Sequence, residues 1–286
     1  MRTLLFFVIL QPIMIIDGKA IAQKILLEVK AEVAVQIKPP HLTVFTCAPN
    51  FETQKFLSLK QKRAAEVGIE VEVISLDPAM VTVAIIALVH DVLAHTDGVV
   101  VQLPFPPTID VTAVLKAIPA THDVDALLYK GEETTILPPV VGAIDSIATT
   151  QNVEWINKNV VVVGNGRLVG APSALYAKSK GAHVSVLEKD SANNATAIAE
   201  ADILILGAGV PGLVTAEMVK VGVVVFDAGT SEEGGMLVGD AAVEVGEKAA
   251  LLTPVPGGIG PITIAVLLRN VLQLSILHSK ESDNVL

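Results

Sequence analysis

Strand-like apolar segments alternate with helix-like segments along most of this 286-residue chain, and this alternation limits the folds open to it. In the first half, residues 41–47, 71–74 and 98–103 read as strands, while residues 53–67 and 84–96 have the apolar spacing of helices. Strands that alternate with helices predict a parallel sheet with right-handed crossovers. We therefore expect an α/β fold.

The second half begins with four valines, residues 160–163, that read as a short buried strand. A glycine-rich turn and a helix to about residue 180 follow, and then come three more strands, the first two separated by a helix at 191–199. This order is typical of a Rossmann-type dinucleotide-binding domain. The strands expected after the turn are residues 183–187, 202–206 and 223–227.

These patterns divide the chain into two domains, with an active-site cleft expected between them. Residues 14–140 form the expected N-terminal α/β substrate domain, and residues 141–263 form the expected dinucleotide-binding domain. A last helix, residues 264–280, can pack on either half. Residues 1–13 place an arginine before an apolar run, as short signal peptides do, but no small-residue cleavage site follows. We interpret them as an N-terminal extension or a miscalled start.

The composition argues against several classes of partner. A net charge of −10 opposes nucleic acid, whose phosphates need a basic field, and an aromatic content of 3% leaves few platforms for stacking bases. No run reaches the roughly 18 uncharged apolar residues that span a bilayer. The single Cys47 fits a reducing compartment, and the six histidines show no metal-ligand spacing. We expect a cytoplasmic protein that binds no metal, nucleic acid or membrane.

Residues 253–263 contain three prolines and three glycines between two apolar segments. Such a run cannot continue a helix or a central strand. Its prolines stiffen the backbone, and its glycines let a flat ligand approach the main chain closely. The alternative is a tight connection between a strand and a helix, for which one glycine and one proline would suffice.

The turn after residues 160–163 has the spacing G-x-G-x-x-x-G, with Gly164, Gly166 and Gly170. Glycines between a buried strand and a helix permit a tight turn against a pyrophosphate, which the first amides of the helix can bind. The alternative is a structural turn. Glu188, at the end of the next strand, can accept both ribose hydroxyls and would repel a 2′-phosphate, which favours NAD over NADP. It can also be a solvated loop acid.

Four polar or aromatic positions in the first half could form a site. Phe56 and Lys60 lie four residues apart on one predicted helix, and hence on one face. Gln102 lies at the carboxyl end of a predicted strand, where open parallel sheets place their ligands. Asp125 alternates with Val124 beyond the next turn. Each position also has an ordinary interpretation, as a solvated helix surface or a turn former.

Taken together, seven segments resemble the bifunctional methylenetetrahydrofolate dehydrogenase/cyclohydrolase family, often called FolD. The resemblance runs from about residue 14 to residue 272, and the proline-glycine run is its most specific part. The segments that carry it are residues 14–24, 97–106, 122–125, 164–172, 201–203, 238–240 and 253–263.

The resemblance implies an enzyme of one-carbon metabolism, active as a homodimer. Such enzymes oxidise 5,10-methylenetetrahydrofolate with NADP or NAD, and then hydrolyse the methenyl product to 10-formyltetrahydrofolate. It makes the first domain the folate-binding one. The catalytic residues that it implies are Lys60, its partner Gln102, and Asp125 as the pterin anchor. The substrate-binding residues are Phe56, Leu103, Pro104, Pro256, Gly257, Gly258 and Thr263. The cofactor-binding residues are Gly164, Asn165, Gly166, Gly170, Glu188 and Thr230.

The sequence also departs from the family pattern. Phe56 stands where the family has tyrosine, and Asn165 and Gly166 replace an arginine and a serine of the turn. These changes bear on the hydrolase step and on the choice of NADP, which most of the family uses. Two alternatives follow: a dehydrogenase without cyclohydrolase activity, and a folate- or nucleotide-binding protein without turnover. A quinate/shikimate-type dehydrogenase pairs similar domains, but we find none of that family's catalytic motifs.

Overall fold

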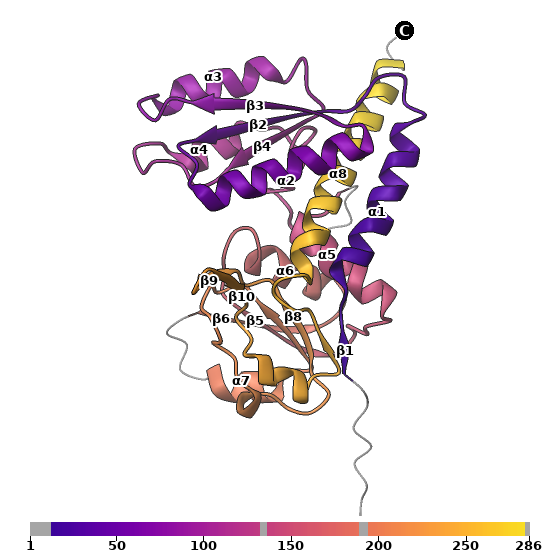
Figure 1. The fold of residues 1–286 in the computed structure, drawn as a ribbon, viewed down its shortest axis with the longest axis vertical. Coiled ribbons are helices and arrows are strands. Elements are labelled where there is room, and N and C mark those ends of the chain that lie inside the picture. Colours follow the sequence, from indigo (N-terminus) through magenta and orange to yellow (C-terminus); the bar gives the residue numbers. More distant parts are fainter. Residues whose placement is uncertain (1–12, 132–135, 189–193, 284–286) are drawn as a thin grey trace, which may run out of the picture. The chain divides into compact units, whose positions relative to one another are not determined.

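The computed structural model describes residues 13–131, 136–188 and 194–283 (Figure 1). Within these limits the chain forms two compact units. Among the described residues, unit I takes residues 13–17 and 154–258, and unit II takes residues 18–153 and 259–283. The units therefore do not follow the expected break at residue 140. The first described residues, 13–17, belong to unit I, and the last helix belongs to unit II.

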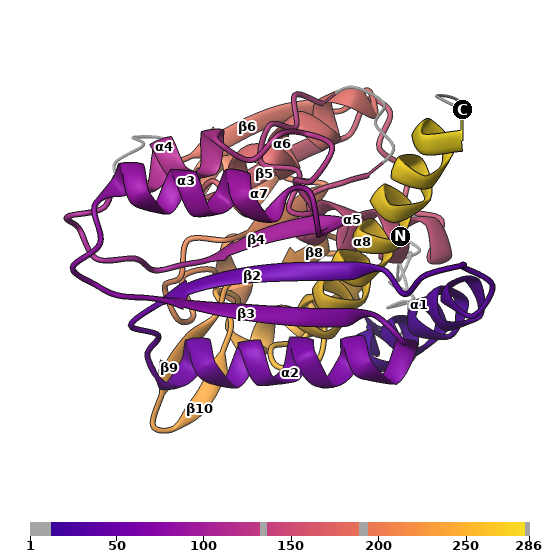
Figure 2. The ribbon, with the colours of Figure 1, turned by 90° about the horizontal axis from the view of Figure 1, so that it is seen from above.

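Unit II is built on a three-stranded parallel sheet with the order β3-β2-β4. Helices α3 and α4 cover one face of this sheet and α2 lies on the other (Figure 2). The face toward α3 and α4 buries alternate apolar residues such as Phe45 and Val101. The elements are β2 (His41–Cys47), α2 (Phe51–Val67), β3 (Glu70–Leu76), α3 (Thr82–Val92), β4 (Gly98–Gln102) and α4 (Val111–Lys116).

The elements predicted for this half are present, and their ends have local causes. Asn50 caps the start of α2 by accepting a hydrogen bond from the Thr53 N–H at 2.8 Å, and Gly68 ends it at a φ of 85°, as predicted. Helix α3 ends earlier than predicted, at Val92. The residues beyond it are drawn toward β2 instead, because the Thr96 hydroxyl donates to the His41 carbonyl oxygen at 3.0 Å.

Three further helices complete unit II: α1 (Gly18–Val33), α5 (Pro139–Thr150) and α8 (Ile259–Asp283). The last helix packs against both α1 and α5, so of the two halves it joins the first. Among the described residues, Ile259–Lys280 is the one helix long and apolar enough to cross a membrane. However, 67% of that stretch is buried within the protein, where its apolar side chains form core.

Unit I contains a six-stranded parallel sheet with the order β1-β11-β8-β7-β5-β6. Its central strands are buried on both faces, which explains their valine-rich sequences. The strands are β1 (Met14–Ile15), β5 (Asn159–Val163), β6 (His183–Leu187), β7 (Ile203–Leu206), β8 (Val224–Asp227) and β11 (Leu251–Leu252). The other elements are α6 (Gly170–Ser179), α7 (Asn194–Glu200), the 3-10 helices η1 (Ala216–Met218) and η2 (Val243–Glu247), and a hairpin of β9 (Ser231–Glu233) and β10 (Met236–Val238).

Two segments near the expected boundaries, β1 and α5, belong to the other unit from the one that the sequence-based division gives them. Strand β1 pairs with β11, so Met14 and Ile15 extend the sheet of unit I although they precede the first domain in sequence. Helix α5 packs on α8 and belongs to unit II. Both placements depend on contacts between residues far apart in sequence, which local patterns do not record.

Candidate active site

Lys60 and Gln102 meet at the carboxyl end of β4. Helix α2 presents Lys60 on the sheet face opposite α3, and its Nζ donates a hydrogen bond of 2.7 Å to Oε1 of Gln102, the last residue of β4. Gln102 pairs in register with Thr46 of β2, whose hydroxyl has no partner among the described residues. The helix face and the strand end therefore bring together an amine and an amide that lie 42 positions apart in sequence.

Asp125 is the third member of this group. Burial lowers the pKa of the Lys60 amine below its ordinary value of 10.5, and the nearby Asp125 charge partly opposes that shift. Burial likewise raises the pKa of the Asp125 carboxyl, and Lys60 partly opposes it. The two groups thus share one low-dielectric environment. An amine whose ammonium form is disfavoured in this way is more readily available as a base.

The other expected substrate-binding residues of unit II lie in α2, directly after β4, and in α8. Phe56 lies one helical turn before Lys60 with 39% of its surface exposed. Leu103 and Pro104 follow Gln102 directly and are joined by a cis peptide bond. Thr263, in the first turns of α8, donates its hydroxyl to the Gly260 carbonyl oxygen at 2.8 Å.

The expected substrate-binding residues of unit I belong to the stiff loop after β11. The Val255–Pro256 bond is cis, and Gly257 has a φ of 107°, which favours glycine. The Gly258 N–H donates to the Pro254 carbonyl oxygen at 2.7 Å, and a side chain at Gly258 would lie 2.6 Å from that oxygen. The backbone conformation of this loop therefore requires glycine at positions 257 and 258.

The glycine turn of unit I follows β5 and begins α6. Gly164 has a φ of 94°, and a Cβ on Gly170 would lie 1.9 Å from the Gly164 carbonyl oxygen, so both positions require glycine. A Cβ on Gly166 would meet nothing within 4 Å, so open space lies beside the start of the helix. This open, exposed turn before a helix leaves room for the pyrophosphate of a dinucleotide. The predicted tight turn is therefore present.

The remaining expected cofactor residues lie at the same edge of the sheet. Glu188 follows β6 and Thr230 follows β8, and both are exposed. The Asn165 side chain donates a hydrogen bond of 2.9 Å to Oε1 of Glu188. This bond holds the carboxylate next to the turn. Among the described residues, no group of three metal-ligating side chains is present.

Two family models match the chain. Residues 16–125 match the catalytic domain of tetrahydrofolate dehydrogenase/cyclohydrolase, and residues 138–279 match its NAD(P)-binding domain. The chain belongs to the tetrahydrofolate dehydrogenase/cyclohydrolase family. The resemblance predicted from the seven segments is confirmed, and so is the α/β class with a dinucleotide-binding domain.

Curated relatives resemble the chain over nearly its whole length. The bifunctional protein FolD of Exiguobacterium sibiricum is 36% identical over 272 residues, which cover 91% of this chain and 98% of the relative. The FolD protein of Aquifex aeolicus is 34% identical over 274 residues, with coverage of 91% and 94%.

Solved structures agree with this assignment. The FolD enzyme of Trypanosoma brucei, determined with NADP and an inhibitor, has a TM-score of 0.88 and 32% identity, covering 94% of this chain and 99% of that chain. The NAD-dependent methylenetetrahydrofolate dehydrogenase of Saccharomyces cerevisiae shares the fold, with a TM-score of 0.71 at 17% identity over 94% of this chain and all of that one.

The alternation of Asp123 and Asp125 around Val124 indicated that both could face the cleft or that either could be only a turn former, and no catalytic role was assigned to Asp123. Its side chain is 3% exposed, and its Oδ2 accepts a hydrogen bond of 2.6 Å from the Leu127 N–H, which closes the turn that contains Asp125. Its Oδ1 has no partner among the described residues. Burial, followed by the charge of Asp125, raises the pKa of Asp123 to about 7. The alternation of Asp123 and Asp125 was the signal available in the sequence.

Two buried carboxylates of unit I were also missed. Asp227 accepts backbone N–H groups of Gly229, Asp240 and Ala241 at 2.9–3.2 Å, and burial raises its pKa to about 6. Asp240 is fully buried and accepts three more N–H groups, from residues 208–210, at 2.6–3.1 Å. Together they fix the loops after β7 and β8 at the dinucleotide-binding edge of the sheet. Asp227 also borders a pocket of about 430 Å³.

We predict that Asp123→Asn changes how stability depends on pH. The folded state holds a proton on Asp123 up to about pH 7, whereas an unfolded chain releases it near 3.8, so wild-type stability falls as pH rises between these values. The asparagine cannot ionise, and its side-chain oxygen can still accept the Leu127 N–H. Relative to wild type, the variant should gain roughly 2–4 kcal/mol between pH 5 and pH 8 in urea unfolding.

The matched control for this prediction is Asp91→Asn, which changes an exposed carboxylate near the end of α3. It should keep the wild-type dependence on pH. Parallel stability curves for wild type and Asp123→Asn would show that Asp123 is ionised in the folded protein at neutral pH.

Proposed function

We propose that this chain oxidises 5,10-methylenetetrahydrofolate with NAD(P)⁺ and hydrolyses the 5,10-methenyl product to 10-formyltetrahydrofolate. The observation that carries the proposal is the bond between Lys60 and Gln102, next to Asp125, in the unit that matches the family's catalytic domain. These are the residues to which the sequence resemblance gives the catalytic roles. The proposal assigns Lys60 the proton transfer, Gln102 the orientation of Lys60, and Asp125 the binding of the pterin ring.

The oxidation step requires positioning more than acid–base help. Hydride leaves a carbon whose neighbouring nitrogen stabilises the cation that forms, so no protein group has to move a proton. NAD(P)⁺, when bound, accepts this hydride. The residues proposed to hold it are Gly164, Asn165, Gly166, Gly170, Glu188 and Thr230.

The hydrolysis step requires a base. Water adds to the cationic methenyl carbon, and Lys60, whose neutral form is favoured by burial, takes the proton that the water loses. The C–N bond to the other nitrogen then breaks as the new hydroxyl gives up its proton and that nitrogen gains one, which leaves a formyl group on one nitrogen and an N–H on the other. Gln102 fixes the direction of the amine by accepting one of its N–H groups.

We expect Lys60→Met to slow hydrolysis of 5,10-methenyltetrahydrofolate by about 10²- to 10⁴-fold, because it removes the proton acceptor. Hydride transfer, which moves no proton through the lysine, should fall by a smaller factor. The decay of methenyl absorbance and the formation of NAD(P)H measure the two steps separately. Lys62→Met, at an exposed position of the same helix, is the control and should leave both rates unchanged. Equal hydrolysis by wild type and Lys60→Met would refute the proposed role.

We further propose that the chain uses NAD at least as well as NADP. The support is the position of Glu188, which Asn165 holds beside the glycine turn, where a 2′-phosphate would meet a like charge. Asn165 and Gly166 also lack the charge and hydroxyl of the arginine and serine found in the family.

Removal of this carboxylate tests the cofactor preference. Glu188→Ser should raise the ratio of kcat/KM for NADP to that for NAD about tenfold, because the repulsion is lost. Glu200→Ser, an exposed change at the end of α7, should leave the ratio as it is. If Glu188→Ser also leaves it unchanged, the carboxylate does not read the ribose.

A homodimer and a cytoplasmic location are proposed as well. The family resemblance supports both. The dimer is also supported by exposed large apolar side chains of unit I, such as Met236 and Val243, which are 69% and 89% exposed. Sedimentation equilibrium should give twice the monomer mass of 29.9 kDa, and cell fractionation should recover the protein with cytoplasmic enzymes. A monomeric mass at micromolar concentration would contradict the dimer.

A further inference from the structure

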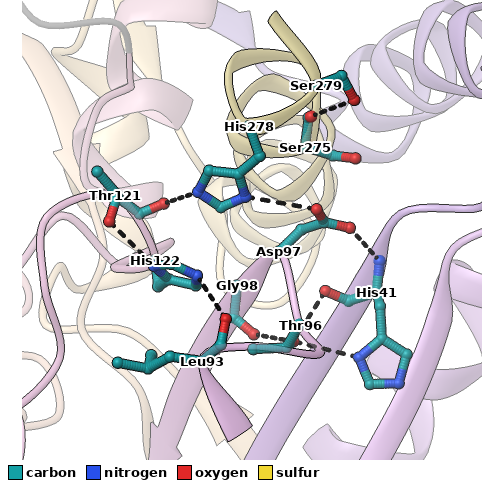
Figure 3. Close-up of polar contacts among 10 residues, drawn as sticks. All are labelled: His41, Leu93, Thr96, Asp97, Gly98, Thr121, His122, Ser275, His278 and Ser279. Atoms are coloured by element: carbon teal, nitrogen blue, oxygen red, sulfur yellow. Dashed lines mark hydrogen bonds and ion pairs between the residues drawn. The ribbon is translucent and has the colours of Figure 1, made fainter. Parts of the chain in front are cut away.

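A second cluster of titratable side chains lies in unit II, at the opposite end of β4 from Gln102 (Figure 3). It consists of Asp97, just before β4, His122, and His278 of α8, and we call it the histidine cluster. The rings of His122 and His278 have centroids 4.5 Å apart and are tilted by 34°. None of these residues belongs to the proposed catalytic group.

The contacts of His278 suit a charged ring. Its Nε2 lies 3.0 Å from the Thr121 carbonyl oxygen, and its Nδ1 lies 3.4 Å from Oδ1 of Asp97. Both oxygens accept hydrogen bonds, so only a ring with protons on both nitrogens satisfies both contacts. The Asp97 carboxylate supplies the opposite charge, and its Oδ2 also accepts the backbone N–H of His41 at 2.8 Å.

The contacts of His122 suit a neutral ring. Its Nε2 lies 3.1 Å from the Leu93 carbonyl oxygen and must donate, whereas its Nδ1 lies 3.0 Å from the Thr121 hydroxyl, which can donate to it. Burial, followed by the neighbouring His278, lowers the pKa of His122, and the Leu93 and Asp97 oxygens partly oppose this. The surroundings of His122 therefore favour its neutral ring.

The histidine cluster is connected to Asp125 through the turn that follows His122. The His122 carbonyl oxygen accepts the Val99 N–H at 2.8 Å, and Asp123 forms a single parallel bridge with Val99. Val124 packs against Gly98, where a Cβ would lie 2.4 Å from its Cγ1. The Asp123 carbonyl oxygen accepts the Ala126 N–H at 3.1 Å, so Asp125 lies in a turn that is anchored at the start of β4.

Helix α8 holds this segment at two points. His278 contacts the Thr121 carbonyl oxygen, and the fully buried Asn270 donates to the Val124 carbonyl oxygen at 2.9 Å. If the His278 contact is lost, the hydrogen bond from Asn270 is the one that still joins α8 to residues 121–125, among those of the described residues.

We propose that His122 and His278 are positioning residues of the folate site, and that protonation of His122 weakens folate binding. With His122 neutral, the ring pair holds residues 121–123 at the start of β4 and so places the turn that carries Asp125. A proton on His122 is opposed by the neighbouring His278, and it makes Nδ1 a donor, so that the hydrogen bond with the Thr121 hydroxyl must reverse. The proposal rests on the proposed function through the role of Asp125.

Other titratable groups near the pair are accounted for. Asp97 is the carboxylate that faces it from the start of β4, and His41 of β2 approaches Asp97 through its backbone while its ring contacts the Thr96 hydroxyl at 3.2 Å. Asp123 and Asp125 follow His122 in the same segment. Because Asp123 titrates as well, the proposal is tested by the difference in folate binding between wild type and a variant without the His122 ring.

The test measures the dissociation constant of folic acid between pH 5.5 and pH 7.5 by fluorescence, for wild type, His122→Gln and His278→Gln. For wild type it should rise roughly threefold to tenfold as pH falls, which corresponds to a shift of about half to one pKa unit in His122 on binding. His122→Gln keeps a donor for Leu93 and cannot be charged, so it should lose this added pH dependence. His278→Gln should bind more weakly at pH 7.5, with KM raised and kcat little changed.

Two further measurements separate this proposal from the proposed function. Histidine ring NMR should show that His122 titrates below its ordinary 6.5 and that folic acid lowers its pKa further, by linkage. Amide hydrogen exchange in residues 121–125, corrected for its intrinsic pH dependence, should quicken as His122 takes its proton. His90→Gln, at an exposed position of α3, is the control for substitution of histidine and should behave as wild type.

An identical pH dependence of folic acid binding in wild type and His122→Gln would overturn the proposal. So would exchange at residues 121–125 that does not respond to the titration of His122. If no variant and no wild-type sample binds folic acid at any pH, the proposed function fails, and the hydrogen-exchange result still decides whether the ring pair fixes the segment.

Discussion

The chemistry proposed for this chain depends on a lysine amine that the fold partly buries. Lys60 has one neutral hydrogen-bond acceptor, Gln102, and one nearby carboxyl, Asp125, whose own ionisation is disfavoured by burial. A fully ionised partner would stabilise the ammonium and remove its use as a base, whereas no partner at all would leave its direction undefined. The amide fixes the direction of the amine without adding charge.

Both units place their functional groups at the carboxyl ends of parallel strands, where helix N-termini and loops are free to bind a ligand. In unit II, Lys60 and Gln102 lie at the end of β4, and Asp125 lies in a turn that is anchored at the start of β4. In unit I, Asp227 and Asp240 accept six backbone N–H groups and so hold two loops in place. The buried carboxylates of unit I thus position loops. In unit II, Asp123 closes a turn, and Asp125 is proposed to bind the substrate.

Local patterns were sufficient to predict strands β2 to β8, the end of α2 at Gly68 and the tight turn at Gly164, because each depends on residues adjacent in sequence, whereas β1 and β9 to β11 were not predicted. The importance of Lys60 was not evident from its surroundings, a run of charged residues, and came from the family resemblance. Contacts across long separations could not be predicted, such as β1 with β11 and His278 with Asp97, which lie 181 positions apart. The unpartnered oxygen of Asp123 likewise follows from burial in three dimensions, which sequence alternation only suggests.

The most direct measurement of the central claim is the titration of the lysine side chains, by NMR of protein labelled with ¹³C at the lysine ε-carbons. Lys60→Met identifies the Lys60 signal by its loss. The account predicts that Lys60 loses its proton at a lower pH than the exposed lysines, and that Gln102→Leu, which removes the acceptor but keeps the burial, alters its chemical shift. A Lys60 signal that titrates together with the exposed lysines would contradict the account, because the amine would then have no advantage as a base.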